Sequence, residues 1–197
     1  MGVSDVRMSN DRTLVDDVLR ERPGAFTRLV EAHQHLVWHI LLRMVRSPQD
    51  AEDLSQECFL RVFRKLDQFR FDCALSSWIG RIAFSLGSRH LERKSLPIER
   101  GGAFEDGEVF DPLAHIADQA DVEGELAEAE LHAHALRLID ALPPLQRTVL
   151  SLYHAEELGI AEIARITERP EGTIKNLLFR IRLRLREALK EAIGEPA

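Results

Sequence analysis

The sequence has few of the features that stabilise extracellular or membrane proteins. It contains two cysteines among 197 residues, Cys58 and Cys73, and they do not form a CxxC pair. Two isolated cysteines cannot build a disulfide framework, so both are expected to be reduced, apolar side chains. No apolar run approaches the length that spans a bilayer, and the first residues contain no signal-peptide core. These absences predict a cytoplasmic protein.

The common signatures of catalysis are also missing. The sequence has no nucleophile elbow, no phosphate-binding glycine loop and no HExxH motif. His33, His35 and His39 lie close together, but only the last two share a helix face, and no acidic or cysteine ligand completes a metal site. We therefore predict a protein that is not an enzyme, with no cofactor, no bound metal and no small-molecule substrate.

Acidic residues exceed basic residues, but the excess is confined to one segment. The formal net charge is −7. Residues 1–94 carry a net charge of +2, residues 95–131 carry −10, and residues 132–197 carry +1. The middle segment is also rich in glycine and proline. It is predicted to be a flexible acidic linker between two small domains.

Apolar residues recur at intervals of three and four on both sides of this linker, which predicts an all-α fold. The N-terminal extension, residues 1–24, is polar and is expected to form only one or two helical turns. Helices are predicted over residues 25–45, 48–68, 78–94, 127–141, about 144–158, 160–166 and from 173 onward. The predicted domains are residues 25–94 and 132–190, joined by the linker at 95–131.

Residues 159–190 have the pattern of a helix-turn-helix. A short apolar helix is followed by a turn that contains Pro170 and Gly172, and Thr173 is expected to cap a long second helix. Projected at 100° per residue, the second helix has its apolar residues on one stripe. They are Ile174, Leu178, Ile181, Leu185 and Ala188. Such a pair of helices is typical of DNA-binding proteins, in which the second helix enters the major groove.

Polar and aromatic residues near the start of the second helix lie away from its apolar stripe. We predict that these residues read base edges and that arginines farther along contact phosphates. The predicted base-reading residues are Lys175, Asn176, Phe179 and Arg180, next to Thr173, and the predicted phosphate contacts are Arg184 and Arg186. The alternative is a solvated basic helix that only complements its own dipole.

The predicted helix over residues 48–68 has two distinct faces, and Ser47 and Pro48 are expected to cap its start. Its core stripe is formed by Ala51, Leu54, Cys58, Val62 and Leu66, widened by Phe59 and Phe63. The far side carries Glu52, Asp53, Gln56, Glu57 and Leu60. An acidic face with one leucine in its middle suits docking of a basic helix. An ordinary solvated face is the alternative.

Aromatic and basic residues are concentrated between residues 68 and 94. Residues 68–77 are predicted to form a loop, with Ser76 or Ser77 capping a helix that begins at Trp78. Aromatic rings beside cations can stack unpaired bases and follow a nucleic-acid backbone. They are equally what a small helical core needs, and the pattern alone favours neither.

Four motifs together are similar to those of the extracytoplasmic-function sigma factors, the small promoter-specificity subunits of bacterial RNA polymerase. They are DAEDLSQECFLRVF at 50–63, SWIGRIA at 77–83, ALPPLQRTVLSL at 141–152 and IAEIARITERPEGTIKNLLFRIRLRLR at 160–186. The resemblance covers residues 25–94 and 135–190 in the order and spacing of the family. It implies two helical domains, called sigma regions 2 and 4, and an alternative sigma factor that selects promoters and assists DNA melting.

The resemblance also implies partners for each surface. Core polymerase would bind through the coiled coil of its β′ subunit, at Asp50, Asp53, Gln56, Glu57 and Leu60, and through its β flap. The melted minus-ten element of promoter DNA would be captured by Phe69, Arg70, Phe71, Trp78, Arg81 and Arg89. The predicted base-reading residues would recognise the minus-thirty-five element. A separately encoded anti-sigma factor, often membrane-anchored in this family, is a further expected partner.

Two places depart from the usual family pattern. Ser85 and Arg89 stand where Asn and Asp are usual, and Asn176 and Leu177 replace the Ser-Arg of a common recognition-helix motif. Both departures bear on promoter preference.

One rival reading is a stand-alone helix-turn-helix repressor or activator. Such a protein would need symmetry to span two half-sites and has no use for an acidic linker. Another, a purely protein-binding adaptor, leaves the basic helix unexplained.

Overall fold

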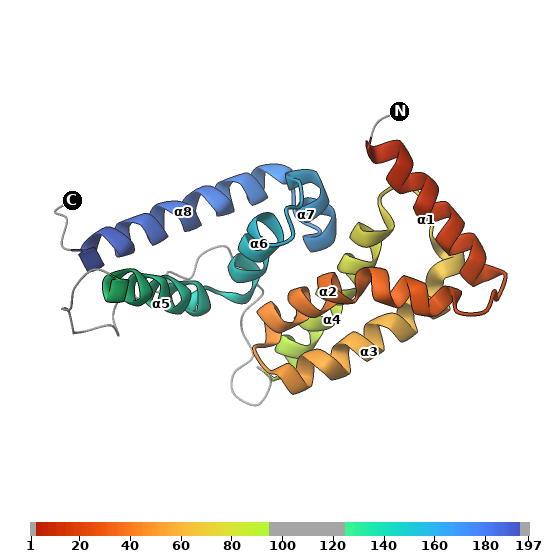
Figure 1. Cartoon of the computed structure of the whole chain (residues 1–197), viewed down its shortest axis with the longest axis horizontal. Helices are drawn as coiled ribbons and strands as arrows, with labels where there is room; N and C mark the ends of the chain where they lie inside the picture. Colours follow the sequence, from red (N-terminus) through yellow and green to blue (C-terminus); the bar gives the residue numbers. More distant parts are fainter. Residues whose placement is uncertain (1–2, 95–124, 194–197) are drawn as a thin grey trace.

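The computed structural model describes residues 3–94 and 125–193, and this part of the chain is helical, which confirms the all-α prediction (Figure 1). The N-terminal half comprises α1 (Val3–Leu19), α2 (Ala25–Val45), α3 (Pro48–Lys65), the short 3-10 helix η1 (Leu66–Gln68) and α4 (Leu75–Lys94). The C-terminal half comprises α5 (Glu125–Ala141), α6 (Pro144–His154), α7 (Ile160–Thr167) and α8 (Glu171–Ile193). None of these helices is both long and apolar enough to cross a membrane.

Most of the predicted linker, residues 95–124, lies outside the described residues. Its C-terminal part does not: α5 already begins at Glu125, two residues before the predicted start. The N-terminal extension was underestimated more severely, because α1 has 17 residues where one or two turns were predicted. Tertiary contacts explain this length. Val15 and Val18 are buried against the core, and Asp17 forms ion pairs with Arg22 and Arg28.

Two predicted helix starts were also wrong. Helix α4 begins at Leu75 instead of Trp78, because the carboxylate of Asp11 in α1 accepts a hydrogen bond from the Leu75 N–H at 2.9 Å. Helix α8 begins at Glu171, so Thr173 lies inside the first turn and is not its cap. The cap predicted for α3 is confirmed, since the Ser47 hydroxyl accepts from the Asp50 N–H at 3.3 Å.

The N-terminal half is built around α2, which packs against both α3 and α4. Leu29, Ile40 and Leu41 of α2 are fully buried in this core. Helices α2 and α4 approach closely at Gly87, where a Cβ would lie 2.6 Å from the Met44 sulfur and would displace that flexible side chain. The cysteines are unpaired, and burial raises the pKa of Cys58 to about 12, as expected for an inert core thiol.

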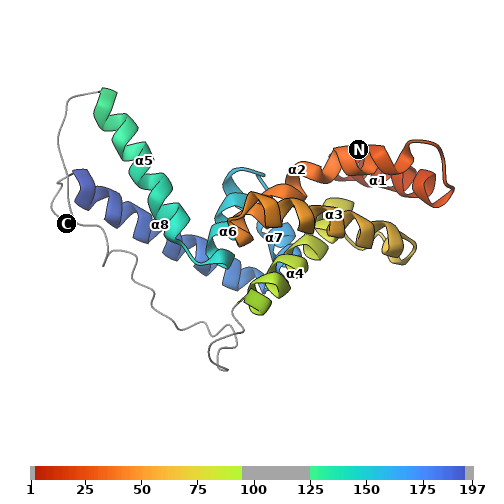
Figure 2. The same ribbon diagram turned by 90° about the horizontal axis from the view of Figure 1, so that it is seen from below.

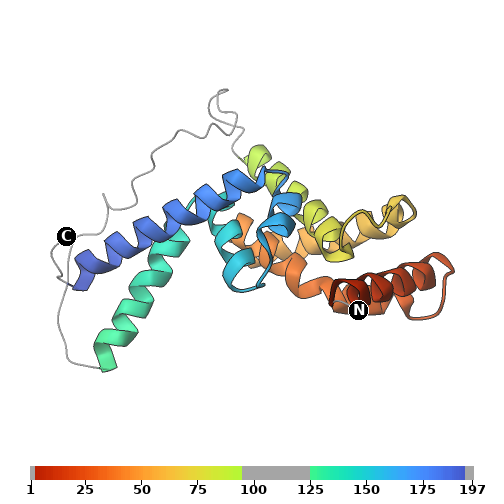
Figure 3. The same ribbon diagram turned by 90° about the horizontal axis from the view of Figure 1, so that it is seen from above.

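The two halves share one hydrophobic core. Helix α6 packs against α2, and α7 packs against α4, as the two rotated views show (Figures 2 and 3). Ile163 and Ile166 of α7 and Ile174 of α8 are fully buried in this joint core. The contact is close: a Cβ at Gly80 of α4 would lie 3.0 Å from Cγ1 of Ile166. Neither half therefore buries its apolar surface alone in this arrangement.

A buried arginine makes hydrogen bonds between the halves, in addition to the ion pairs of His39 with Glu156, Arg43 with Asp140 and Arg81 with Glu168. Arg147 of α6 donates to the backbone oxygens of Arg43 and Met44 in α2, at 2.5 and 3.3 Å, and to those of Asp140 and Leu142 at 3.1 and 2.8 Å. Carbonyls at helix C-termini lack helical partners and carry partial negative charge, which a cation satisfies. Burial lowers the pKa of Arg147 to about 10, so the guanidinium stays charged near neutral pH.

Candidate nucleic-acid interface

The helix-turn-helix is held by hydrogen bonds at each end of its first helix. At the start of α7, the Glu162 carboxylate accepts from the Gly159 N–H at 3.1 Å. At its end, Glu168 adopts a left-handed conformation with φ of 55°, and its N–H bonds to the Ala164 oxygen. This reversal turns the chain directly into α8, which begins three residues later. The tight turn therefore fixes the direction of α8 relative to α7.

Helix α8 has the two faces predicted from its sequence. Ile174, Leu178 and Ile181 are buried against α6 and α7, and Ala188 is buried farther along, whereas Leu185 is only half-buried. The predicted base-reading residues, Lys175, Asn176, Phe179 and Arg180, are all exposed. A phenylalanine that is 67% exposed among cations is unusual on a helix that buries its other face. This face can therefore contact a partner without loss of core packing.

The face extends along the helix beyond the residues singled out from sequence. Leu183, one turn after Phe179, is 45% exposed and was not predicted as a contact. Arg186 is exposed and lies two turns after Phe179, on the same side, whereas Arg184 is half-buried. Helical periodicity from Phe179 is the signal that would have placed Leu183 on this face.

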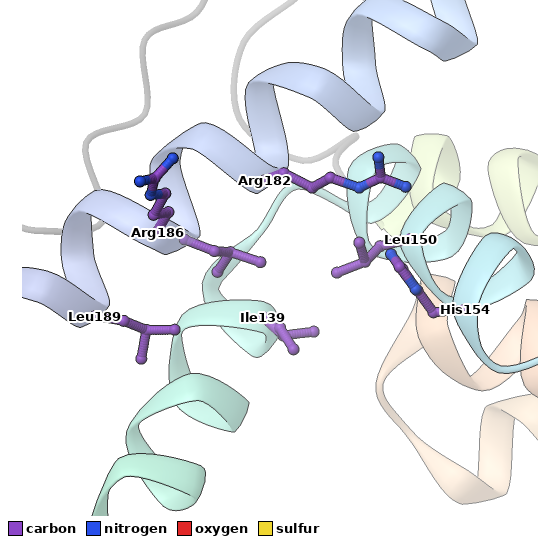
Figure 4. Close-up of a pocket in the computed structure, with 7 residues that line it drawn as sticks. Ile139, Leu150, His154, Arg182, Arg186 and Leu189 are labelled. Carbon is purple, nitrogen blue, oxygen red and sulfur yellow. The ribbon is translucent and has the colours of Figure 1, made fainter.

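An apolar groove of about 590 Å³ lies where α5, α6 and α8 meet (Figure 4). Ile139 of α5, Leu150 of α6 and Leu189 of α8 line it. Figure 4 shows the Arg186 guanidinium directed away from these apolar side chains. Arg182 extends instead toward α6, where its guanidinium lies 5.0 Å from the centre of the Tyr153 ring. Within the described residues, Arg186 makes no ion pair or ring contact of this kind.

The aromatic cluster predicted to capture melted DNA is largely turned into the protein. Phe69 is buried, and its ring packs 4.7 Å from that of Phe71 and 5.4 Å from that of Trp78. Phe71 and Trp78 are half-buried, and Arg70 is exposed. The structure thus uses Phe69 for packing, which was the alternative for this cluster, and leaves Phe71 and Trp78 partly accessible beside the exposed Arg70.

The cations of α4 have partners of their own. Arg89 donates to the Ser85 hydroxyl at 2.9 Å and to the Ser85 backbone oxygen at 3.2 Å. The two positions of α4 that depart from the family pattern, Ser85 and Arg89, are therefore hydrogen-bonded to each other. Arg81 lies 3.9 Å from the Glu168 carboxylate, at the turn before α8. This ion pair places a predicted minus-ten residue next to the predicted minus-thirty-five helix.

The acidic face of α3 is mostly present as predicted. Glu52, Asp53, Gln56 and Leu60 are exposed, and the half-buried Glu57 pairs with Arg61 on the same helix. The prediction that Phe63 widens the core stripe was wrong, because it is 56% exposed. Its ring meets Phe26 of α2 edge-on at 5.0 Å, so the two rings extend the surface beyond Leu60.

Asp50 differs from the residues of this face because its carboxylate is paired with side chains of α4. Its carboxylate accepts from Lys94 at 2.7 Å and lies 3.6 Å from His90, so it links the start of α3 to the end of α4. The hydrogen bond from Lys94 lowers the pKa of Asp50 below its ordinary value. Asp50 is thus not grouped with the other predicted polymerase contacts.

The fold and the exposed face of α8 define a helix-turn-helix DNA-binding protein with a second helical half. Two family models match the chain: Sigma-70 region 2 over residues 29–96 and Sigma-70, region 4, over residues 134–185. The RNA polymerase sigma-H factor of Pseudomonas aeruginosa is 33% identical over 94% of this chain and 96% of the relative. The ECF RNA polymerase sigma-E factor of Escherichia coli is 32% identical over 87% of this chain and 90% of the relative. The chain belongs to the extracytoplasmic-function sigma factors of bacterial RNA polymerase, and it is an alternative sigma factor that directs the polymerase to promoters.

Solved structures show the same fold at lower sequence identity. CnrH in complex with the cytosolic domain of CnrY has a TM-score of 0.63 and 20% identity, covering 92% of this chain and 97% of that chain. The sigma factor RpoE from Bartonella quintana, in complex with the anti-sigma factor NepR, has a TM-score of 0.59 and 19% identity, covering 85% of this chain and 98% of that chain.

Proposed function

We propose that this sigma factor reads the minus-thirty-five element with the exposed face of α8. The observation that carries the proposal is the position of Phe179, exposed between Lys175, Asn176 and Arg180 and opposite a buried stripe. Lysine, arginine and asparagine can donate hydrogen bonds to base edges, and an aromatic ring can contact a thymine methyl. The protein itself performs no chemistry. Because polymerase and chromosome are its partners, it acts in the cytoplasm.

We assign capture of the melted minus-ten element to the accessible part of the aromatic cluster. Arg70 is exposed beside the half-buried rings of Phe71 and Trp78, which suits a backbone phosphate next to an unpaired base. Phe69 supports these rings from below instead of stacking on DNA. Holding an unpaired strand at this surface is how the protein would assist melting, since it lowers the free energy of the open state.

The docking site for the polymerase β′ coiled coil is the outward face of α3. Asp53, Gln56 and Glu57 provide acceptors for basic side chains, and the exposed Leu60 and Phe63 provide apolar contact area. Acidic and apolar residues in this mixture suit a basic amphipathic helix. Asp50 contributes indirectly, by holding α3 against α4. A contact with the β flap stays a prediction without an assigned surface.

Promoter binding requires the two halves to separate. Elements about 25 base pairs apart, as the minus-ten and minus-thirty-five elements are, lie about 85 Å apart at the rise of B-form DNA. Here Arg81 and Glu168, which belong to the two DNA-reading surfaces, lie only 3.9 Å apart. The 30 residues of 95–124 can extend to about 100 Å, which is sufficient for the separation. The arrangement described here is therefore the form not engaged with promoter DNA.

An anti-sigma factor would act on this closed form. The similar folds of CnrH and RpoE were each solved with a protein partner, and NepR is named as an anti-sigma factor. We propose a separately encoded inhibitor for this chain that keeps the halves together or covers their exposed faces. Promoter activity that is constant under every growth condition, with no copurifying inhibitor, would count against it.

Transcription with a reconstituted holoenzyme tests the proposed function directly. Core polymerase with this chain should initiate at a defined set of promoters from a genomic library, whereas core polymerase alone should not. The stand-alone repressor makes the opposite prediction, namely tight binding of this chain to a palindromic site without polymerase. Tight palindrome binding with no stimulation of core polymerase would refute the assignment.

A further inference from the structure

The loop that joins η1 to α4 contains a residue with an uncommon backbone conformation. Phe71 has φ of 60°, in the left-handed region that side chains other than glycine and asparagine rarely occupy. Such conformations persist only where surrounding contacts fix them, and they are concentrated at functional sites. The contacts that fix this residue are therefore informative.

Two consecutive residues of α1 supply these contacts. The Arg12 guanidinium lies 5.1 Å from the centre of the Phe71 ring, and Phe69 packs against the same ring at 4.7 Å. The neighbouring Asp11 accepts the hydrogen bond from the Leu75 N–H that begins α4. Helix α1 thus contacts this loop both at Phe71 and where it leads into α4, although none of the sequence motifs includes α1.

Among the described residues Arg12 has no anionic partner, whereas the side chains of Arg81 and Arg89 are engaged within the protein. Arg81 pairs with Glu168, and Arg89 is hydrogen-bonded to Ser85. No carboxylate lies within ion-pair distance of Arg12 or Arg70 in the part of the chain that the structure describes. Both side chains are exposed. A guanidinium that lies over a ring at this distance keeps N–H groups that can donate to a phosphate.

We propose that Arg12 of α1 is a further DNA-contacting residue, which binds a backbone phosphate of the unwound promoter strand beside Phe71. The stacked ring holds the guanidinium in place, so little side-chain entropy is lost when the phosphate binds. The cation of Arg70 lies on the same loop and provides a second phosphate contact. This inference rests on the proposed capture of melted DNA by this loop, and it adds the N-terminal helix to that site.

The experiment compares holoenzymes reconstituted with wild-type chain, Arg12→Ala, Arg12→Lys and the control Arg20→Ala. Arg20 is an exposed arginine just beyond the same helix, so the control removes an equal charge. Affinity is measured over a series of salt concentrations for two templates. One is a promoter whose minus-ten segment is held open by mismatches, and the other is a duplex with only the minus-thirty-five element. Melting temperatures of the free chains report folding.

Arg12→Ala should lower the salt slope on the open template by about 0.7, the value for one phosphate contact on a single strand. The slope on the upstream duplex should not change. Arg12→Lys should keep most of the slope, because it keeps the charge, and Arg20→Ala should behave as wild type. An unchanged slope for Arg12→Ala, or an equal loss in Arg12→Lys and Arg20→Ala, would overturn the inference. A wild-type holoenzyme that does not prefer the open template would instead refute the proposed function.

Discussion

The two proposed DNA-reading surfaces of this sigma factor differ in how far they are already exposed. On α8, Lys175, Asn176 and Phe179 project into solvent from a helix whose other face is buried. On the N-terminal half, Phe69 is buried and Arg81 is paired with Glu168. The proposed surface for double-stranded DNA is therefore exposed in this arrangement. On the proposed surface for melted DNA, Phe69 is packed within its own half, and separation of the halves would release Arg81 from Glu168.

This difference has a physical basis in the two ligands. A major groove presents its donors and acceptors before any protein binds, so a rigid helix can be complementary to it in advance. An unpaired strand exists only after melting, and exposed aromatic rings without it would leave apolar surface in water. Packing Phe69, Phe71 and Trp78 together reduces that cost in the unbound protein.

The largest effect is expected from removing the arginine that joins the halves. Arg147→Met should lower the free energy of unfolding by about 2–5 kcal/mol, because carbonyls at the ends of α2 and α5 and that of Leu142 lose their donors. Urea denaturation measures this change. The matched control is Arg43→Met, which removes a half-exposed cation 3.8 Å from Asp140 and should cost less than about 1 kcal/mol. Equal effects of the two substitutions would mean that Arg147 does not hold the halves together.

An intermediate effect is expected on the outward face of α3. Glu57→Lys should weaken binding of core polymerase by about tenfold or more, because it places like charges together in the interface. Its partner Arg61 is on the same helix, so folding should be nearly unaffected. Titration of labelled chain with core enzyme gives the affinity, and helicity with melting temperature serves as the control. Unchanged affinity would remove this face from the polymerase interface.

The smallest effect on stability is expected from the ion pair between the two DNA-reading surfaces. Arg81→Ala should change the free energy of unfolding by less than about 1 kcal/mol, since both side chains are largely exposed. Glu168→Ala removes the same pair but keeps the predicted DNA contact. If Arg81 binds melted DNA, only Arg81→Ala should slow open-complex formation by holoenzyme. Equal rates for the two variants would restrict Arg81 to the ion pair.

Helical periodicity predicted α2 to the residue and separated the two faces of α8 correctly. Those predictions succeeded because each helix buries one stripe and exposes the other. Phe63 was assigned to the core because an aromatic next to a core stripe usually packs inside. Its ring lies beside Phe26 at the start of α2, a contact that periodicity within α3 cannot show.

Contacts between segments that are distant in the sequence could not be predicted from helical patterns. The length of α1 depends on Arg28 and on the core around Val15, not on its own amphipathicity. The start of α4 depends on Asp11, 64 positions earlier. Arg147 lies within a motif that was recognised, yet nothing in that motif shows that its guanidinium binds carbonyls of α2. Projection treats each helix alone, so it cannot identify the polar residues that join helices.

The most direct test of the account concerns base reading by α8. Run-off transcription by holoenzymes carrying Asn176→Ala, Phe179→Ala or Arg186→Ala should be measured on a panel of minus-thirty-five variants at two salt concentrations. A base-reading contact contributes about 1–3 kcal/mol and discriminates among sequences, whereas a phosphate contact weakens every promoter alike and changes the salt slope by about one. Asn176→Ala and Phe179→Ala should therefore change the order of preference among the variants, and Arg186→Ala should not. A uniform loss in all three, or no loss in any, would contradict the assignment of this face to the promoter.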